Sequence, residues 1–338
     1  MHNNPEGLLF HSRTSSVAVC AGASHTAFRQ KRNRIRDFFS PRHKRSGMEI
    51  HMLKIADNPT LAGLSSFFPS IVFSTATGTD LTLDLLLPQT VEGDTASRFP
   101  LIIFIEGSAW HFPENNWEIP QLSRLSCSGY AVALVTHRNI DDGHPAPAYL
   151  MDVKTAVRFM RAHAEEYHVD PDRVYAFGTS SGANAALLLG LTGDMEEFRT
   201  EEYSGFSDSV CGVIDCFGPT DLQAFLDWPG EEGSLDKQET FRAFCGGQLD
   251  PALLQKCSPV HYVTQGRDYV PFLIAHGDAD PLVPFSQSEH LVSLLEQAGA
   301  EVGFICVENG VHEGNFWSQP LYDIFLAFLD RLSGIRRG

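Results

Sequence analysis

Short apolar runs alternate with amphipathic segments along residues 99–332. The run at 101–105 is apolar throughout, which is typical of a strand covered on both faces. The segment at 148–167 places Val153, Ala156, Val157 and Met160 on one helical face. Further strands are expected at 130–136, 174–179, 210–217, 271–276 and 302–307, and further helices at 119–128, 183–191, 289–298 and 321–332. This alternation predicts an α/β fold with a mostly parallel sheet and helices on both faces.

An antiparallel hairpin is expected before the first of these parallel strands. Residues 70–73 and 81–87 have strand-like composition, and Thr77-Gly78-Thr79-Asp80 between them is rich in turn-forming residues. No internal repeat is apparent.

A glycine-flanked serine stands at the junction of an expected strand and an expected helix. The sequence Gly178-Thr179-Ser180-Ser181-Gly182 has the form G-x-S-x-G. In that context the serine occupies a strained turn with its hydroxyl above the sheet, and glycine on each side avoids collisions with neighbouring backbone. Ser180 is therefore the candidate nucleophile. Taken alone, the motif is also compatible with a flexible loop.

A serine nucleophile needs a base and a group that orients that base. His312 follows the expected strand 302–307, and Asp278 and Asp280 follow the expected strand 271–276. The chain order of serine, acid and histidine is that of α/β-hydrolases. All three groups come just after strand ends, where open α/β sheets collect their ligands. From their positions alone, either aspartate could be the acid.

Backbone donors for an oxyanion are expected in the loop that leaves strand 101–105. Glu106-Gly107-Ser108-Ala109-Trp110 contains small residues that allow close approach of N–H groups to a substrate. We assign Ser108 as the donor from this loop, with Gly107 or Ala109 as alternatives. The second expected donor is Ser181, the residue after the nucleophile.

These motifs resemble those of α/β-hydrolase superfamily esterases. The resemblance is carried by Gly178 to Gly182, by His276-Gly277-x-x-Asp280-x-x-Val283-Pro284 and by Gly310-Val311-His312, and it extends over residues 99–332. The branch is the one with feruloyl-esterase-like, hormone-sensitive-lipase-like and prolyl-oligopeptidase-like domains. The resemblance implies an α/β-hydrolase fold, with Asp280 as acid and His312 as base. The chain departs from the family at Glu106, where relatives usually carry histidine.

The resemblance also implies a small cap over the site, formed by the insertion at about 219–269. Its aromatic residues could line a substrate pocket or could form the core of the cap itself. Two tryptophans near the oxyanion loop, Trp110 and Trp117, are stronger pocket candidates, although Trp110 could be simple packing. The cap aromatics are Phe225, Trp228, Phe241 and Phe244.

Composition favours a water-soluble enzyme with one large core. The chain has 338 residues, of which 43% are hydrophobic. No apolar run reaches the ~18 residues that a membrane span requires. The formal net charge of -17 argues against nucleic acid as a partner, because phosphate binding requires clustered Lys and Arg.

Residues 1–47 differ in charge from the rest of the chain. They hold nine Lys or Arg residues against Glu6 and Asp37, a net charge of +7. This composition predicts a disordered leader, with a catalytic domain at 48–338. A signal peptide is not expected, because the basic cluster follows the short apolar run at 17–23. Met48 or Met52 as the true start is an alternative.

Cysteine usage points to a reduced environment. The seven cysteines are an odd number and show no metal-ligand spacing. We therefore expect a cytoplasmic protein without structural zinc, and no cofactor.

The combined prediction is a serine carboxylic-ester hydrolase that acts on small acyl or aryl esters. Two alternatives remain at this stage. One is a serine peptidase of the prolyl-oligopeptidase type, and the other is an α/β-hydrolase scaffold without catalysis, because a fold alone does not imply a function.

Overall fold

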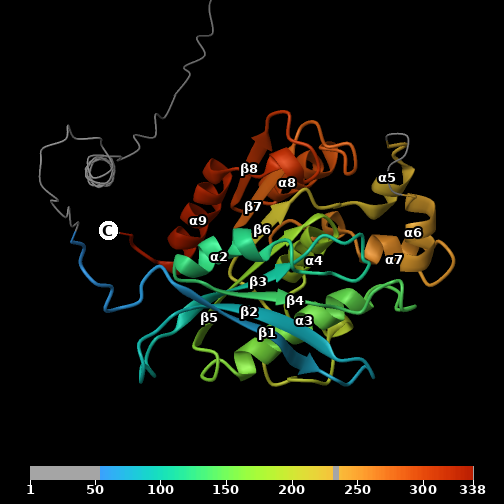
Figure 1. Ribbon diagram of the computed structural model, residues 1–338. Helices are drawn as coiled ribbons and strands as arrows, with labels where there is room; N and C mark the ends of the chain where they lie inside the picture. The colour runs from blue at the N-terminus through green and yellow to red at the C-terminus, as the bar shows by residue number, and fades with distance from the viewer. Residues whose placement is uncertain (1–53, 231–235, 338) are drawn as a thin grey trace, which may run out of the picture. The chain divides into compact units, whose positions relative to one another are not determined.

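The computed structural model describes residues 54–230 and 236–337, and residues 58–336 form one compact unit. The predicted leader at 1–47 lies outside the described residues. Figure 1 labels the elements of the compact unit.

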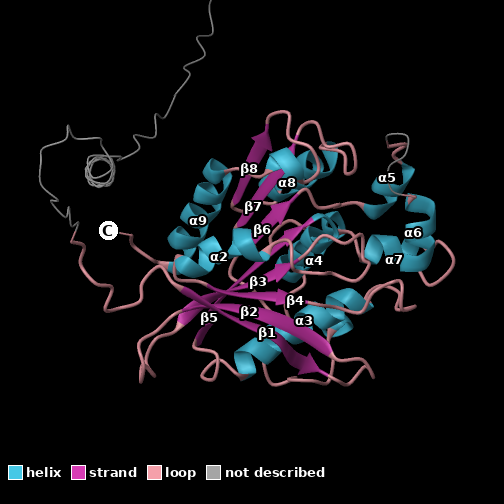
Figure 2. Ribbon diagram, in the orientation of Figure 1, coloured by secondary structure: helices cyan, strands magenta, loops and turns pink. Residues whose placement is uncertain are grey.

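The core is an eight-stranded sheet in the order β1-β2-β4-β3-β5-β6-β7-β8. The first two strands are antiparallel to their neighbours, and β4, β3 and β5 to β8 are parallel. The predicted hairpin and mostly parallel sheet are thus confirmed (Figure 2). The strands are β1 (Ser65–Ser74), β2 (Leu81–Pro88), β3 (Phe99–Ile105), β4 (Ala131–Val135), β5 (Val169–Thr179), β6 (Val213–Cys216), β7 (Phe272–Gly277) and β8 (Val302–Val307).

Helices cover both faces of this sheet, as predicted. On one face the buried side chains of α3, α4 and α8 belong to the same core cluster as Leu101 and Ile103 of β3, and on the other those of α2 and α9 share a cluster with Ile102 and Phe104. The α-helices are α2 (Ile119–Cys127), α3 (Ala148–Ala162), α4 (Ser180–Leu191), α5 (Leu222–Asp227), α6 (Lys237–Phe244), α7 (Pro251–Lys256), α8 (Ser286–Gln297) and α9 (Gln319–Ser333), and the 3₁₀ turns are η1 (Glu196–Phe198), η2 (Pro259–Tyr262) and η3 (Gly314–Phe316).

Several predicted boundaries were wrong: β5 begins at Val169 and not at 174, β6 covers only Val213–Cys216, and β1 and α3 differ by five residues at one end. β1 begins at Ser65, five residues before the predicted strand, because Pro69 and a left-handed Ser70 interrupt the pattern without ending the strand. An edge strand tolerates both. Helix α3 ends at Ala162, five residues before the predicted end at Tyr167. The chain must turn there, because Val169 already pairs with Phe99 in the sheet.

The insertion at 219–269 folds as three short helices, α5 to α7, followed by η2. Figure 1 shows the three helices grouped together. At the start of each helix an aspartate side chain accepts a hydrogen bond from a backbone N–H of the first turn, and these aspartates are Asp221, Asp236 and Asp250. Within the described ranges, no helix has the length and apolarity to cross a membrane. The six cysteines of these ranges are free.

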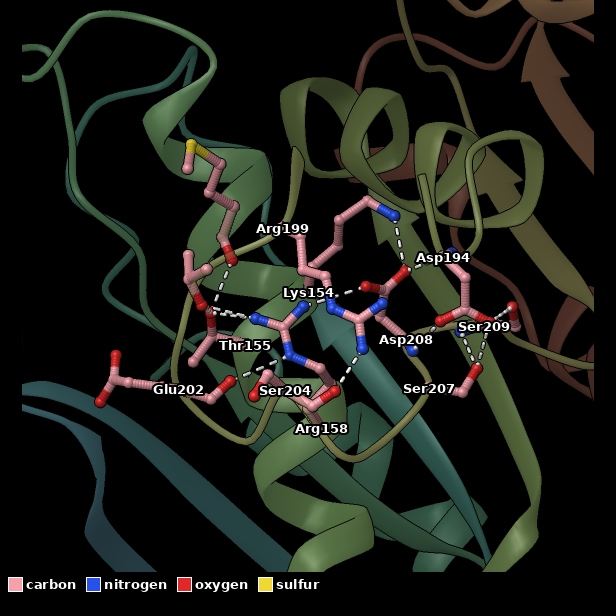
Figure 3. Close-up of polar contacts among 12 residues, drawn as sticks. Lys154, Thr155, Arg158, Asp194, Arg199, Glu202, Ser204, Ser207, Asp208 and Ser209 are labelled. Carbon is pink, nitrogen blue, oxygen red and sulfur yellow. Dashed lines mark hydrogen bonds and ion pairs between the residues drawn. The ribbon is translucent and has the colours of Figure 1, made fainter. Parts of the chain in front are cut away.

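A buried charge cluster fixes the segment between α4 and β6. Asp208 accepts hydrogen bonds from Lys154 Nζ at 2.7 Å and from Arg158 Nη1 at 3.0 Å (Figure 3). All three side chains are at most 1% exposed. Lys154 also donates to the carbonyl of Thr192, at the end of α4. Lys154 therefore links Thr192 to Asp208 within this segment, and Arg158 adds a second contact to Asp208.

Removal of the Asp208 carboxylate is expected to lower the stability of the fold. Asp208→Ala leaves two buried cations without a carboxylate and should lower the free energy of unfolding by about 3–5 kcal/mol. The matched control is Glu301→Ala, which breaks an exposed pair with Arg331 and should cost at most about 1 kcal/mol. Urea denaturation measures both. Equal losses would contradict the role of the cluster.

Candidate active site

Ser180 occupies a strained turn between β5 and α4. Its φ is +49°, and the preceding Thr179 is extended. A Cβ at Gly178 would overlap the carbonyl of Gly182, and one at Gly182 would overlap the carbonyl of Ile105. The predicted reason for both glycines is confirmed. A Cβ at Gly107 would lie 2.6 Å from the Cβ of Ser180, so the loop after β3 touches the turn as well.

His312 and Asp280 are brought together from two different loops. His312 Nδ1 lies 2.7 Å from Asp280 Oδ2, and the other carboxylate oxygen accepts the N–H groups of Leu282 and Val283 at 2.8 and 3.0 Å. The alternative acid, Asp278, instead accepts the N–H of Asn309. The bond to Asp280 places the ring proton on Nδ1 and leaves Nε2 free to act as a base.

The environment of Asp280 favours its ionised form. Burial would raise its pKa, but hydrogen bonds from His276 and His312 and the backbone bond from Val283 hold that pKa well below its usual range. Asp280 is therefore an anion throughout the neutral range.

A second histidine, His276, shares this carboxylate and was not recognised from the sequence as a functional residue. Its Nε2 lies 3.0 Å from the carbonyl oxygen of Val283 and 3.2 Å from Asp280 Oδ2. Its Nδ1 accepts from the hydroxyl of Ser288 at 2.7 Å, and the ring is fully buried. The sequence signal was its place at the head of the H-G-x-x-D motif.

The N–H groups of the loop after β3 are used differently from the expectation. Gly107 donates to Thr179 Oγ1 at 2.8 Å, and Ser108 donates to Ser181 Oγ at 2.9 Å. The hydroxyl of Ser181 also accepts the N–H of Trp110 at 3.3 Å. Within the described residues, the N–H of Ala109 has no acceptor. Of the predicted donors in this loop, the alternative Ala109 is thus the available one.

These groups surround one cavity of about 180 Å³. Ser180 and His312 both line it, although no hydrogen bond joins them among the described residues. Trp110 is buried and lines the cavity. Trp117 is 72% exposed, does not line it, and donates through Nε1 to Glu114. The full lining is Gly107, Ala109, Trp110, Ser180, Ser181, Pro219, Phe225, Leu282, Val283, His312 and Glu313.

The cap aromatics divide between the two roles considered for them. Phe225 of α5 lines the cavity. Phe241 and Phe244 of α6 are buried against Trp110, with ring centroids 5.6 and 4.7 Å from its own. The first is a pocket residue, and the other two support the pocket wall from behind.

Glu313, which lines this cavity, lies within electrostatic range of two further carboxyl groups, those of Glu106 and Glu118. Burial, together with the charges of Glu313 and Glu106, raises the pKa of Glu118 to about 7. Burial likewise raises the pKa of Glu106, whose carboxylate accepts the N–H of Asn115, and that of Glu313. Within the described ranges, no group of three or more His, Cys, Asp or Glu residues is arranged to hold a metal ion.

Residues 83–295, more than half of the chain, match the family described as BD-FAE. The chain belongs to the BD-FAE family. Among curated proteins, this BD-FAE chain is similar to the esterase LipC of Mycobacterium tuberculosis, with 28% identity over 63% of this chain and 52% of LipC. It is also 27% identical to a probable isoprenylcysteine alpha-carbonyl methylesterase of Oryza sativa, over 71% of this chain and 56% of that one. The chain thus spans about half the length of these relatives.

Solved structures confirm the α/β-hydrolase fold of the BD-FAE chain. A truncated carbohydrate esterase from gut microbiota superposes with a TM-score of 0.64 and 28% identity, over 82% of this chain and all of that one. The esterase Est2 of Thermogutta terrifontis superposes with a TM-score of 0.64 and 24% identity, over 79% of this chain and 94% of that one.

The hydroxyl of Ser181 is expected to stabilise the loop of this BD-FAE site. Ser181→Ala removes the acceptor of two N–H groups, those of Ser108 and Trp110, and should cost about 1–3 kcal/mol of unfolding free energy. Ser293→Ala, an exposed serine-to-alanine change in α8, should stay within about 0.5 kcal/mol. Chemical denaturation compares the two. A neutral Ser181→Ala would show that the loop does not depend on this hydroxyl.

Proposed function

We propose that this chain is a serine hydrolase of carboxylic esters. The observation that carries the proposal is the bond between His312 and Asp280 at a cavity that Ser180 also lines, from a left-handed turn. This combination supplies a nucleophile, a base with a free nitrogen and an anion that orients the base. The named esterases among the relatives support the same conclusion.

The reaction proceeds through an acyl-enzyme. His312 Nε2 accepts the proton of the Ser180 hydroxyl as Ser180 Oγ attacks the ester carbonyl. His312 then donates this proton to the leaving alkoxide as the ester C–O bond breaks. Water, deprotonated in turn by His312, releases the acid and restores Ser180. Asp280 stabilises the imidazolium in both steps. In the free enzyme such catalytic hydrogen bonds are often long and tighten when substrate binds.

The oxyanion is held by two N–H groups in this mechanism. One is that of Ser181, which stands in the first turn of α4, where helix N–H groups have no partner within the helix. The other is that of Ala109. We prefer Ala109 to Ser108 or Gly107, because both of those already donate to side chains of the β5–α4 turn.

The substrate class follows from the size and lining of the cavity. Its volume of about 180 Å³ is below the range of roughly 300–1,000 Å³ found for pockets that bind drug-sized ligands. Pro219, Phe225, Leu282 and Val283 make much of the wall apolar. We therefore propose small acyl or aryl esters as substrates.

Loss of the nucleophile is the first test. Ser180→Ala should lower kcat/KM for p-nitrophenyl acetate by at least about 10³-fold. Wild-type protein should be labelled by a fluorophosphonate at Ser180, as intact-mass and peptide mass spectrometry would show. Wild-type protein that is neither labelled nor active would favour a scaffold without catalysis, and full activity in the variant would remove Ser180 from the mechanism.

The two aspartates provide a matched pair. Asp280→Asn removes the anion that orients His312 and should lower kcat about 10⁴-fold, by analogy with the serine protease triad. Asp278→Asn alters a side chain that bonds the N–H of Asn309 and the thiol of Cys306 and has no contact with His312 among the described residues, so it should change kcat little. Steady-state kinetics on p-nitrophenyl acetate measures both. The opposite ranking would assign the acid to Asp278.

A further inference from the structure

Glu313 places a carboxylate at the wall of the catalytic cavity. It directly follows His312, and among the described residues that line the cavity these two alone carry ionisable side chains other than hydroxyls. The described lining contains no lysine or arginine. A substrate group beside Glu313 therefore meets a negative side chain with no compensating cation in the wall.

The backbone of Glu313 occupies a conformation that is unusual for any residue with a side chain. Its φ is +64° and its ψ is -154°. This region is essentially restricted to glycine, and a side chain there costs of order 1–3 kcal/mol. Such strain is concentrated at functional sites and depends on support from surrounding structure. Other contacts must therefore stabilise Glu313 in this conformation.

The surrounding structure holds the carboxylate in one place. Trp317 Nε1 donates to Glu313 Oε2 at 2.5 Å, and the Trp317 ring is stacked on Tyr322, with ring centroids 5.5 Å apart. Within the described part of the chain, the other oxygen, Oε1, makes no hydrogen bond, and it is not fully enclosed. Glu313 thus keeps one fixed, accessible oxygen for a ligand.

Aromatic rings complete the wall around this carboxylate. Trp110 and Phe225 line the same cavity. The faces of aromatic rings attract cations, and a carboxylate with aromatic rings and no competing cation is suited to an ammonium group.

We propose that Glu313 is a specificity residue that makes this site prefer esters carrying an ammonium group near the scissile bond. The inference rests on the proposed ester hydrolysis and names a substrate class for the same site. Glu313 Oε1 pairs with the ammonium, and Trp110 contacts its alkyl surface. Esters that carry a carboxylate at the same place are disfavoured by repulsion.

The test uses two substrates of the same shape that differ only in charge. Acetylthiocholine carries a trimethylammonium group, and S-(3,3-dimethylbutyl) thioacetate carries a neutral tert-butyl group in its place. At pH 8 and low salt the wild type should favour the cationic thioester about 10-fold in kcat/KM, which corresponds to about 1.4 kcal/mol. Added NaCl should reduce this ratio by screening.

Two variants assign the preference to the carboxylate. Glu313→Gln keeps the shape and an acceptor for Trp317, and should bring the ratio close to 1, because the cationic thioester loses its ionic partner and the neutral thioester has none to lose. Glu313→Gly should do the same without a side chain in the strained conformation. Glu114→Gln is the charge-matched control, because Glu114 is exposed and outside the cavity, and it should keep the wild-type ratio.

The outcomes separate this inference from the proposed function. Wild-type protein inactive on p-nitrophenyl acetate contradicts the proposed function. Wild-type protein that is active on it without favouring acetylthiocholine over its isostere contradicts the inference alone. An unchanged ratio in Glu313→Gln also overturns it. An equal loss on both thioesters would instead assign Glu313 to the support of His312.

Discussion

The close contact between the β5–α4 turn and the end of β3 is the constraint on which the site depends. Gly178, Gly182 and Gly107 let three backbone segments meet where any Cβ would collide. Protein interiors are too closely packed to absorb such collisions. The contact therefore fixes how far Ser180 stands above the sheet. The same contact fixes the position of the loop after β3, which carries Ala109. The same packing contact thus positions the proposed nucleophile and the proposed oxyanion donors.

Much of this arrangement could be read from the sequence because it depends on local order. The G-x-S-x-G motif, the acid loop and the histidine loop each follow a strand, and parallel strands bring their carboxyl ends to one edge. The bond between Asp280 and His312 spans 32 positions of the chain. The order of the elements implied a bond between an acid of this loop and His312, and the family resemblance selected Asp280 over Asp278. Site residues that directly follow a strand end could therefore be predicted from the sequence.

The remaining features depend on distances that no motif encodes. Ser181 Oγ accepts a hydrogen bond from the N–H of Ser108, because two segments 73 positions apart in the chain lie in contact. Likewise, Trp110 turns inward while Trp117, in the same loop, faces solvent. Irregular loops lack the period that separates inner from outer positions. The positive φ of Glu313 could not be predicted either, because glutamate, unlike glycine, is not typical of this backbone conformation.

The cap helices α5 to α7 are short, and each is started by its own aspartate side chain. Only Phe225, from α5, reaches the cavity wall from these three helices. The part of the cavity wall that Phe225 forms thus comes from a different segment than Ser180 and His312. Exchanging α5 for a segment of different length would change the volume of the cavity, while the glycine contacts beneath Ser180 stayed as they are. The cavity can therefore change in size on its cap side without a change in the turn that presents Ser180.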